Sequence, residues 1–176
     1  MRCALAAMAL LVLGAQGALA KTTETLGTDV AIALPLIAGG ITLYKNDWTG
    51  AAQLTVDTLL TVGTAYGLKH VIREKRPDGS DYQSMPSDTA ALAFAPAQFL
   101  WDRYGWEYGV PAYAAAGFVA WSRVDAQKHH WYDVAASGAL SFGISKLITT
   151  RYHSRWSYGA SLTDGGAYGQ LRYEFP

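Results

Sequence analysis

The stretch 122–133, SRVDAQKHHWYD, places a histidine, a carboxylate and an arginine close together in the chain. On a helix predicted over 128–150, His129 and Asp133 stand four positions apart and share one face. The carboxylate can then hold one ring nitrogen and leave the other free to attack an electrophile. Arg123, just upstream, adds a ligand for an anion. Because a His–Asp pair on a helix is more often structural than catalytic, the interpretation depends on the rest of the chain.

A group of basic residues lies earlier, in KHVIREKRP over 69–77. Lys69, Arg73 and Arg76 are spaced to lie on one face at the end of a helix predicted over 48–75. Cations there complement the helix dipole, so one interpretation is a stabilising, solvated helix end. The other is a phosphate clamp, with lysine as a point charge and arginine as a bidentate fork. The segment alone favours neither.

Between these groups lies SMPSDT, residues 84–89. Ser87 is a good N-cap for a helix predicted over 87–103, and a helix start offers a hydroxyl and free N–H groups to an anion. An ordinary N-cap is the commoner interpretation. Asp88 suits the first turn of a helix, but it would repel phosphate if it pointed into the site.

Together the three segments resemble the type 2 phosphatidic acid phosphatase superfamily, which includes bacterial acid phosphatases, lipid phosphatases and vanadium haloperoxidases. The family pattern is Lys, six residues, Arg-Pro; then Pro-Ser-Gly-His; then Ser-Arg, five residues, His, three residues, Asp. The first and third motifs are complete and in order, at Lys69, Arg76-Pro77, Ser122-Arg123, His129 and Asp133. On these two motifs the chain is identified as a member of the superfamily.

The resemblance implies a role for each matched residue. His129 would attack phosphorus in line and form a phosphohistidine that water hydrolyses, while Asp133 orients His129. The phosphate oxygens would be held, and charge in the transition state neutralised, by Lys69, Arg76, Ser87, Thr89 and Arg123. The resemblance implies no metal and no cofactor.

The second motif departs from the family pattern, because Asp88-Thr89 stands where the family has Gly-His. The family's histidine protonates the leaving oxygen, and a threonine hydroxyl is far too weak an acid to do so. Losing general-acid help costs about 10²–10⁴ in rate. Three outcomes stay open: a phosphoanhydride substrate such as a lipid pyrophosphate, Asp88 as the acid if burial and phosphate raise its pKa, or a weak or inactive relative that binds phosphate or lipid headgroups.

The chain as a whole predicts an all-α fold, a bundle of about five helices of the phosphatidic acid phosphatase/haloperoxidase type with a short C-terminal β-hairpin. Helical segments are expected at 28–44, 48–75, 87–103, 107–123 and 128–150. In the segment 48–75 the apolar residues are expected to face the core: Ala52, Leu54, Val56, Leu59, Leu60, Val62 and Leu68. After Tyr152 the apolar period changes to two, which predicts a hairpin over 153–176 that turns at 164–166 and packs on the bundle.

Residues 1–20 read as a cleaved signal peptide, with Arg2, an apolar run and Ala18-Leu19-Ala20 before the cut. Its removal leaves 21–152 as the helical phosphatase-like domain and predicts a periplasmic or secreted protein. The apolar runs in the other helices fall short of the roughly 20 residues that a membrane span needs, which favours a soluble or membrane-surface protein over an integral one. The aromatic content keeps an interfacial location open.

Charge and composition limit the class of partner. The chain has 14 basic and 14 acidic residues, so it has no overall field that attracts nucleic acid. Its single cysteine, Cys3, lies in the predicted leader, which excludes a thiol enzyme. The expected partners are a phosphate-bearing lipid or small-molecule substrate and a membrane surface. The sequence therefore predicts a phosphatase acting on a phosphoester or phosphoanhydride derived from membrane lipid; halide oxidation with vanadate is disfavoured, because that chemistry also uses the missing histidine.

Overall fold

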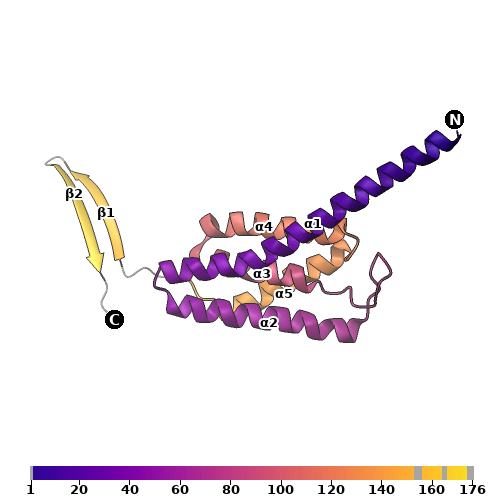
Figure 1. Ribbon diagram of the computed structural model, residues 1–176. Coiled ribbons are helices and arrows are strands. Elements are labelled where there is room, and N and C mark those ends of the chain that lie inside the picture. The colour runs from indigo at the N-terminus through magenta and orange to yellow at the C-terminus, as the bar shows by residue number, and fades with distance from the viewer. Residues whose placement is uncertain (1, 153–155, 164–165, 174–176) are drawn as a thin grey trace.

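The computed structural model describes residues 2–152, 156–163 and 166–173, with side chains from residue 22 to residue 152. The described chain contains five helices (Figure 1): α1 Arg2–Tyr44, α2 Trp48–Ile72, α3 Asp88–Tyr104, α4 Trp106–Asp125 and α5 Trp131–Ile148. The prediction of an all-α body of about five helices is confirmed. The helix predicted over 28–44 is the C-terminal part of α1, which continues without a break from the predicted leader, and cleavage after Ala20 stays a prediction.

Two strands follow the helices, β1 Trp156–Thr163 and β2 Gly166–Tyr173. They pair antiparallel, with Trp156 opposite Tyr173 and Thr163 opposite Gly166. Residues 164 and 165 of the predicted turn lie outside the described residues. Within the described residues no helix contacts either strand, so packing of this hairpin on the bundle stays a prediction.

Helix α3 lies at the centre of the bundle and contacts each of the other four helices. Ser87 is its N-cap, as predicted, and the Ser87 Oγ accepts a hydrogen bond of 3.3 Å from the backbone N–H of Ala90. Alanine favours helices and has a small side chain, so neighbouring backbones approach closely on every side. The buried alanines of α3 are Ala90, Ala91, Ala93, Ala95 and Ala97.

Helix α2 turns most of its apolar side chains outward, and this corrects the prediction that they face the core. Leu54 is buried, but Val56, Leu59 and Leu60 are 47%, 68% and 50% exposed. The buried positions are Gly50, Leu54, Asp57, Thr61, Ala65 and Lys69. The prediction assumed water around the protein, where apolar side chains gather inside. Small and polar side chains fill this interface instead.

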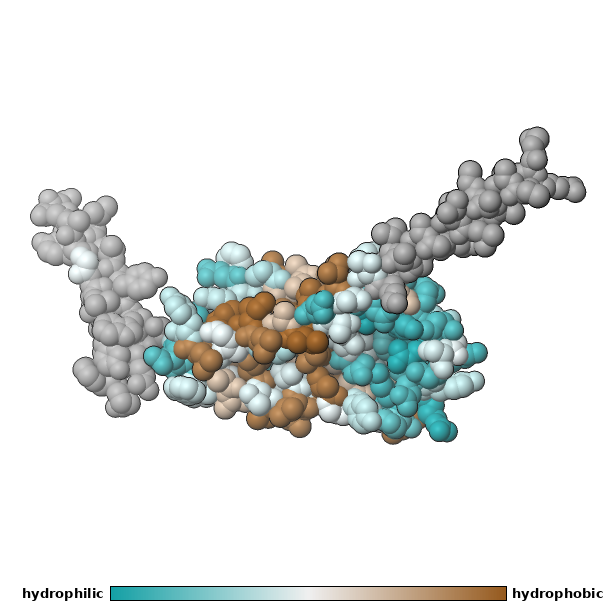
Figure 2. Space-filling model, viewed as in Figure 1, coloured by the Kyte–Doolittle hydropathy of each residue, from teal (hydrophilic) through white to brown (hydrophobic). Residues whose placement is uncertain are grey.

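Helix α5 follows the same pattern. Its buried face carries Ser137, Ser141 and Ser145, and its exposed positions include Phe142 and Leu147. Figure 2 shows apolar residues gathered over the middle of the helical body and polar residues at the end where α2 stops. Of the described helices, one stretch, Thr22–Tyr44, has the length and apolar composition to cross a membrane, which corrects the prediction that every apolar run after the leader is too short.

A buried ion pair closes the end of the bundle opposite the end of α2 that carries Lys69. The Arg103 guanidinium donates through Nε and Nη2 to both carboxylate oxygens of Asp47, at 2.6 and 2.5 Å, and Nη1 donates to the Thr150 carbonyl at 2.7 Å. Asp47 also caps α2 by accepting from the Gly50 N–H at 2.9 Å. The cluster therefore joins the start of α2, the end of α3 and the residues after α5.

The contribution of the Asp47–Arg103 pair to stability depends on pH. Burial by itself raises the pKa of Asp47, but hydrogen bonds from Arg103, Tyr104 and Gly50 outweigh burial and leave this pKa below its ordinary value of 3.8. A folded-state pKa below the unfolded one stabilises the fold at neutral pH. That contribution is lost only as the pH falls below about 4.

We expect Arg103→Ala to lower the free energy of unfolding by about 3–5 kcal/mol, because it leaves the Asp47 carboxylate buried without its partner. Arg73→Ala is the matched control, since Arg73 is exposed at the end of α2. Chemical unfolding of both purified variants measures the difference. Equal losses in the two variants would show that the buried pair contributes nothing beyond an exposed arginine.

Candidate active site

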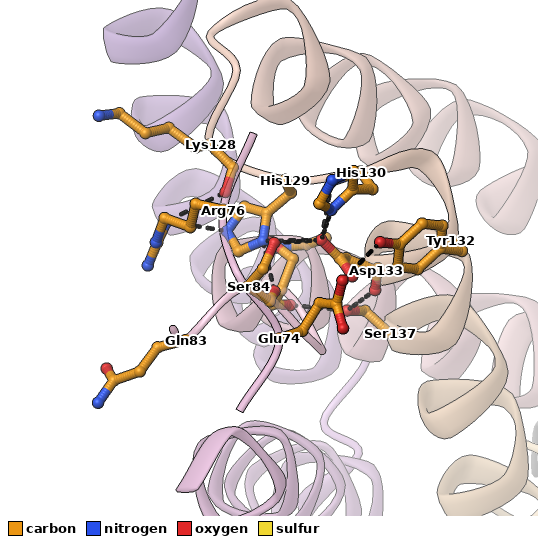
Figure 3. A network of polar contacts seen from close by, with 12 residues as sticks. Glu74, Arg76, Gln83, Ser84, Lys128, His129, His130, Tyr132, Asp133 and Ser137 are labelled. Atoms are coloured by element: carbon orange, nitrogen blue, oxygen red, sulfur yellow. Dashed lines mark hydrogen bonds and ion pairs between the residues drawn. The ribbon is translucent and has the colours of Figure 1, made fainter. Parts of the chain in front are cut away.

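The residues singled out by the motifs gather at one end of the bundle. Lys69 lies near the end of α2, Arg76 in the following loop, Arg123 near the end of α4, and Asp133 in the first turn of α5. Figure 3 shows the side chains of Arg76, His129 and Asp133 turned toward one another around Ser84. Segments far apart in the sequence therefore meet in one polar network.

His129 does not lie on a helix. Helix α5 begins at Trp131 with His130 as its N-cap, so His129 belongs to the turn between α4 and α5, and the predicted shared helix face is wrong. The two side chains are still close, with 3.8 Å between His129 Nδ1 and Asp133 Oδ2. Asp133 is held by the helix cap, because its carboxylate accepts from the backbone N–H of His130 at 2.7 Å. The spacing of His129 and Asp133 therefore reflects the N-cap of α5 and not a shared helix face.

Ser84 links the histidine to the carboxylate. Its carbonyl oxygen lies 2.7 Å from His129 Nδ1, and its hydroxyl donates a hydrogen bond to Asp133 Oδ2. A carbonyl oxygen only accepts, so Nδ1 carries the ring proton and Nε2 keeps its lone pair. Asp133 thus acts on His129 largely through Ser84, a residue to which the sequence assigned no role.

His129 is 3% exposed and uncharged at neutral pH. Burial lowers its pKa most, the hydrogen bond to Ser84 opposes this, and the charges of Arg76 and Lys69 lower it further, to about 4. Nε2 lies 3.5 Å from Nη1 of Arg76. The site therefore presents a neutral imidazole nitrogen beside a guanidinium, an arrangement suited to attack on an anionic phosphorus centre.

The basic residues reach the site from different elements. Helix α2 ends at Ile72, and Arg73 adopts a left-handed conformation with φ 50° that turns the chain out of the helix. Arg73 is exposed, whereas Arg76 returns to donate from Nη1 to the Lys128 carbonyl at 3.3 Å. The prediction that Lys69, Arg73 and Arg76 share a helix face is therefore wrong.

Each of the three cations assigned to phosphate faces a carboxylate. Lys69 Nζ lies 2.7 Å from Asp88 Oδ1, and Arg76 Nε lies 2.8 Å from Asp81 Oδ1. Arg123 Nη1 lies 3.7 Å from Glu24 Oε1, on α1. Sequence reasoning missed Asp81 and Glu24, because neither belongs to a motif and Glu24 is far from Arg123 in the chain.

Asp88 is paired with Lys69, and this pairing sets its protonation state. Burial raises its pKa, but the hydrogen bond and charge of Lys69 outweigh burial and leave it below 3.8. A general acid at neutral pH needs a raised pKa. Asp88 is therefore an ionised partner of Lys69, because burial alone does not raise its pKa, and the role of acid with a phosphate bound stays a prediction.

Ser87 and Thr89 stand at the start of α3. Ser87 is fully buried, and its carbonyl accepts from the Ser137 Oγ at 2.7 Å, so the residue fixes α3 against α5. Thr89 is half-buried, one residue beyond Asp88. Binding of phosphate by these two residues stays a prediction.

The loop 73–87 is fastened to the turn that carries His129. The Asp78 N–H donates to the Gln127 carbonyl of the turn at 3.1 Å, and within the loop the Ser84 N–H donates to the Glu74 carbonyl at 2.9 Å. Lys128 Nζ and Asp78 Oδ2 add an ion pair of 2.8 Å. These bonds hold Ser84 and Arg76 against His129 (Figure 3).

We expect His129 to stay neutral, with its proton on Nδ1, down to about pH 4. Nuclear magnetic resonance of nitrogen-labelled imidazole groups reports both the tautomer and the titration midpoint, and His129→Gln assigns the signal by its loss. A midpoint at or above 6, or a proton on Nε2, would contradict the geometry.

Comparison with known proteins gives one curated relative and one solved structure. The lipid A 4'-phosphatase of Helicobacter pylori is 35% identical over 140 residues, which cover 73% of this chain and 71% of that protein. The crystal structure of a transmembrane PAP2-type phosphatidylglycerolphosphate phosphatase from Bacillus subtilis matches with a TM-score of 0.43 and 22% identity, covering 78% of this chain and 84% of that one. No profile of a known protein family matches the chain.

The relationship to the Helicobacter pylori phosphatase extends over more than two thirds of both proteins at an identity that indicates common ancestry. It agrees with the order and spacing of the first and third motifs, whose residues meet at one end of the helical bundle. The chain belongs to the type 2 phosphatidic acid phosphatase superfamily.

Proposed function

We propose that the protein is a membrane-associated phosphatase that hydrolyses a phosphate ester or anhydride carried by a lipid. The observation that carries the proposal is the buried, neutral His129, whose unprotonated Nε2 accepts a hydrogen bond of 3.5 Å from Nη1 of Arg76. The relative from Helicobacter pylori is named for a phosphate on lipid A, which supports a lipid-borne substrate.

The reaction proceeds in two displacements. His129 Nε2 donates its lone pair to phosphorus as the bond to the leaving oxygen breaks, which gives a phosphohistidine and an alkoxide or phosphate anion that takes its proton from solvent water. Water then attacks phosphorus and the P–N bond breaks, which releases inorganic phosphate and restores the neutral imidazole. Lys69, Arg76 and Arg123 hold the non-bridging oxygens, and Asp133, acting through Ser84, keeps the imidazole oriented.

Thr89 shapes the choice of leaving group. A hydroxyl supplies a hydrogen bond but no proton, so the leaving oxygen departs without general-acid help. A phosphoanhydride, whose leaving group is a phosphate, needs this help least. The preferred substrate is therefore a lipid pyrophosphate or a similarly activated ester, and plain alkyl monoesters react slowly.

The apolar outer surface supports activity at a membrane surface. Exposed Leu59, Leu60 and Leu147 would sit unfavourably in water, and contiguous apolar surface of this kind is typical of contact with lipid or protein. The polar end in Figure 2 carries the site, so the lipid phosphate would meet it at the edge of the membrane. With the leader predicted over 1–20, the site lies on the periplasmic side.

The second candidate is a phosphate- or headgroup-binding protein without turnover, and the absent histidine at position 89 favours it. The two candidates differ in one observable. A phosphatase forms a labelled phosphohistidine from a lipid carrying radioactive phosphate, and a binding protein does not.

We expect His129→Ala to lower phosphate release from a lipid pyrophosphate in mixed micelles by about 10³-fold or more, because it removes the nucleophile. His70→Ala is the matched control, since His70 is exposed on α2. Colorimetric phosphate release and trapping of the phosphoenzyme follow both variants. Unchanged turnover in His129→Ala, or equal losses in the two, would disprove the mechanism.

We expect Thr89→His to speed hydrolysis of alkyl phosphates by about 10²-fold and to leave that of anhydrides within a few fold, since only the former lacks a good leaving group. Asp88 is kept in this variant, because it holds Lys69. Thr89→Gln, similar in size but without an acidic proton, is the control. Equal gains on both substrate classes would show that the residue acts on something other than the leaving group.

A further inference from the structure

The N-terminal helix reaches the phosphate site through Glu24. Arg123 Nη2 donates to the Glu24 carbonyl, and Nη1 faces the Glu24 carboxylate at 3.7 Å. The Arg123 side chain is only 6% exposed, whereas the Glu24 side chain is 34% exposed. An acidic side chain from outside the motifs therefore pairs with Arg123, the arginine that would bind phosphate.

The contact is built into the packing of α1 on α4. A Cβ placed on Gly27 would lie 1.9 Å from the Ser122 Oγ, so the two backbones approach this closely only because residue 27 has no side chain. Gly27 lies one helical turn after Glu24, and Ser122 precedes Arg123. Close approach of the helices thus delivers Glu24 to Arg123.

Glu24 completes the pairing of the three cations with carboxylates. Asp88 and Asp81 balance Lys69 and Arg76, and Glu24 balances Arg123, so these six side chains have no net charge while His129 is neutral. Asp81 and Asp88 each accept a further hydrogen bond from the backbone, at Gln83 and Thr89. The Glu24 carboxylate has the longest of the three ion pairs, which makes it the partner most easily displaced.

We propose that Glu24 is a charge gate on Arg123 that weakens the hold of the site on the phosphate group. A phosphate has to displace the carboxylate before Arg123 can bind it bidentately, and the displaced carboxylate then repels it. Free phosphate, the product, is bound weakly and leaves, while a lipid-borne phosphate gains affinity from contacts of its lipid part. The inference rests on the proposed function for its biological meaning.

Glu24→Gln tests the gate, because it removes the negative charge and leaves the backbone carbonyl that also holds Arg123. We expect the dissociation constant for inorganic phosphate, measured by calorimetry on the full chain, to fall by about tenfold. The inhibition constant for phosphate and the KM for the lipid substrate should fall with it. Tighter binding is the opposite of what loss of a purely structural contact produces.

Two controls separate the gate from a general change in charge. Asp29→Asn removes a negative charge from an exposed position of the same helix and should leave phosphate binding unchanged. In an Arg123→Ala background, Glu24→Gln should add no further tightening, because the gate acts through Arg123.

Unchanged or weaker phosphate binding in Glu24→Gln would overturn the proposal, as would an equal gain in Asp29→Asn or a full gain in the Arg123→Ala background. Calorimetry needs no turnover, so the result stands apart from the proposed activity. If the wild-type protein hydrolyses no lipid phosphate, the proposed function is wrong. The phosphate titration still tests the proposed role of Glu24 in that case.

Discussion

The hydrogen bond between His129 and the carbonyl of Ser84 determines the chemistry of the site. A carbonyl oxygen accepts and never donates, so it fixes the proton on Nδ1 and leaves the Nε2 lone pair beside Arg76. A carboxylate in the same place would favour the imidazolium far more strongly. With the carboxylate of Asp133 placed one step away, behind the Ser84 hydroxyl, burial and the nearby cations prevail and the imidazole stays neutral. Neutrality is what a nitrogen nucleophile requires.

This hydrogen bond in turn depends on how three connections of the bundle meet. Ser84 belongs to the loop between α2 and α3, His129 to the turn between α4 and α5, and Asp133 to the first turn of α5. The central helix α3 brings them together, since its alanines let the surrounding helices approach and Ser87 joins its start to α5. Because the loop is tied to the turn by the backbone bond from Asp78 to Gln127 and by the bond from Arg76 to the Lys128 carbonyl, Ser84 and His129 are positioned as one unit. The site is a property of packed helix ends, with little contribution from any single helix.

The sequence predicts features that depend on neighbouring residues. It does not predict contacts between distant residues, or which face of a helix turns outward in a given solvent. Ser87 was recognised as an N-cap because capping is read from neighbouring residues. The pairing of His129 with Asp133 was expected for the wrong reason, since the true helix start at Trp131 turns a helix face into a cap. The outward apolar face of α2 was predicted inward, because periodicity locates a face but does not say which medium surrounds it. Glu24 gave no signal at all, since its role exists only where α1 crosses α4.

Burial of the cations accounts for their pairing with carboxylates and would account for the weak hold on phosphate that we propose. Lys69 and Arg123 are nearly inaccessible to water, and an unpaired charge in such a place costs several kcal/mol. A ligand-free site therefore needs counter-charges of its own, which Asp88 and Glu24 supply. A phosphate that binds has to displace these carboxylates or bind against their negative charge. The carboxylates that stabilise the fold therefore also lower the affinity of the site for phosphate. A protein with this constraint gains its substrate affinity elsewhere, and the apolar outer surface is where a lipid can supply it.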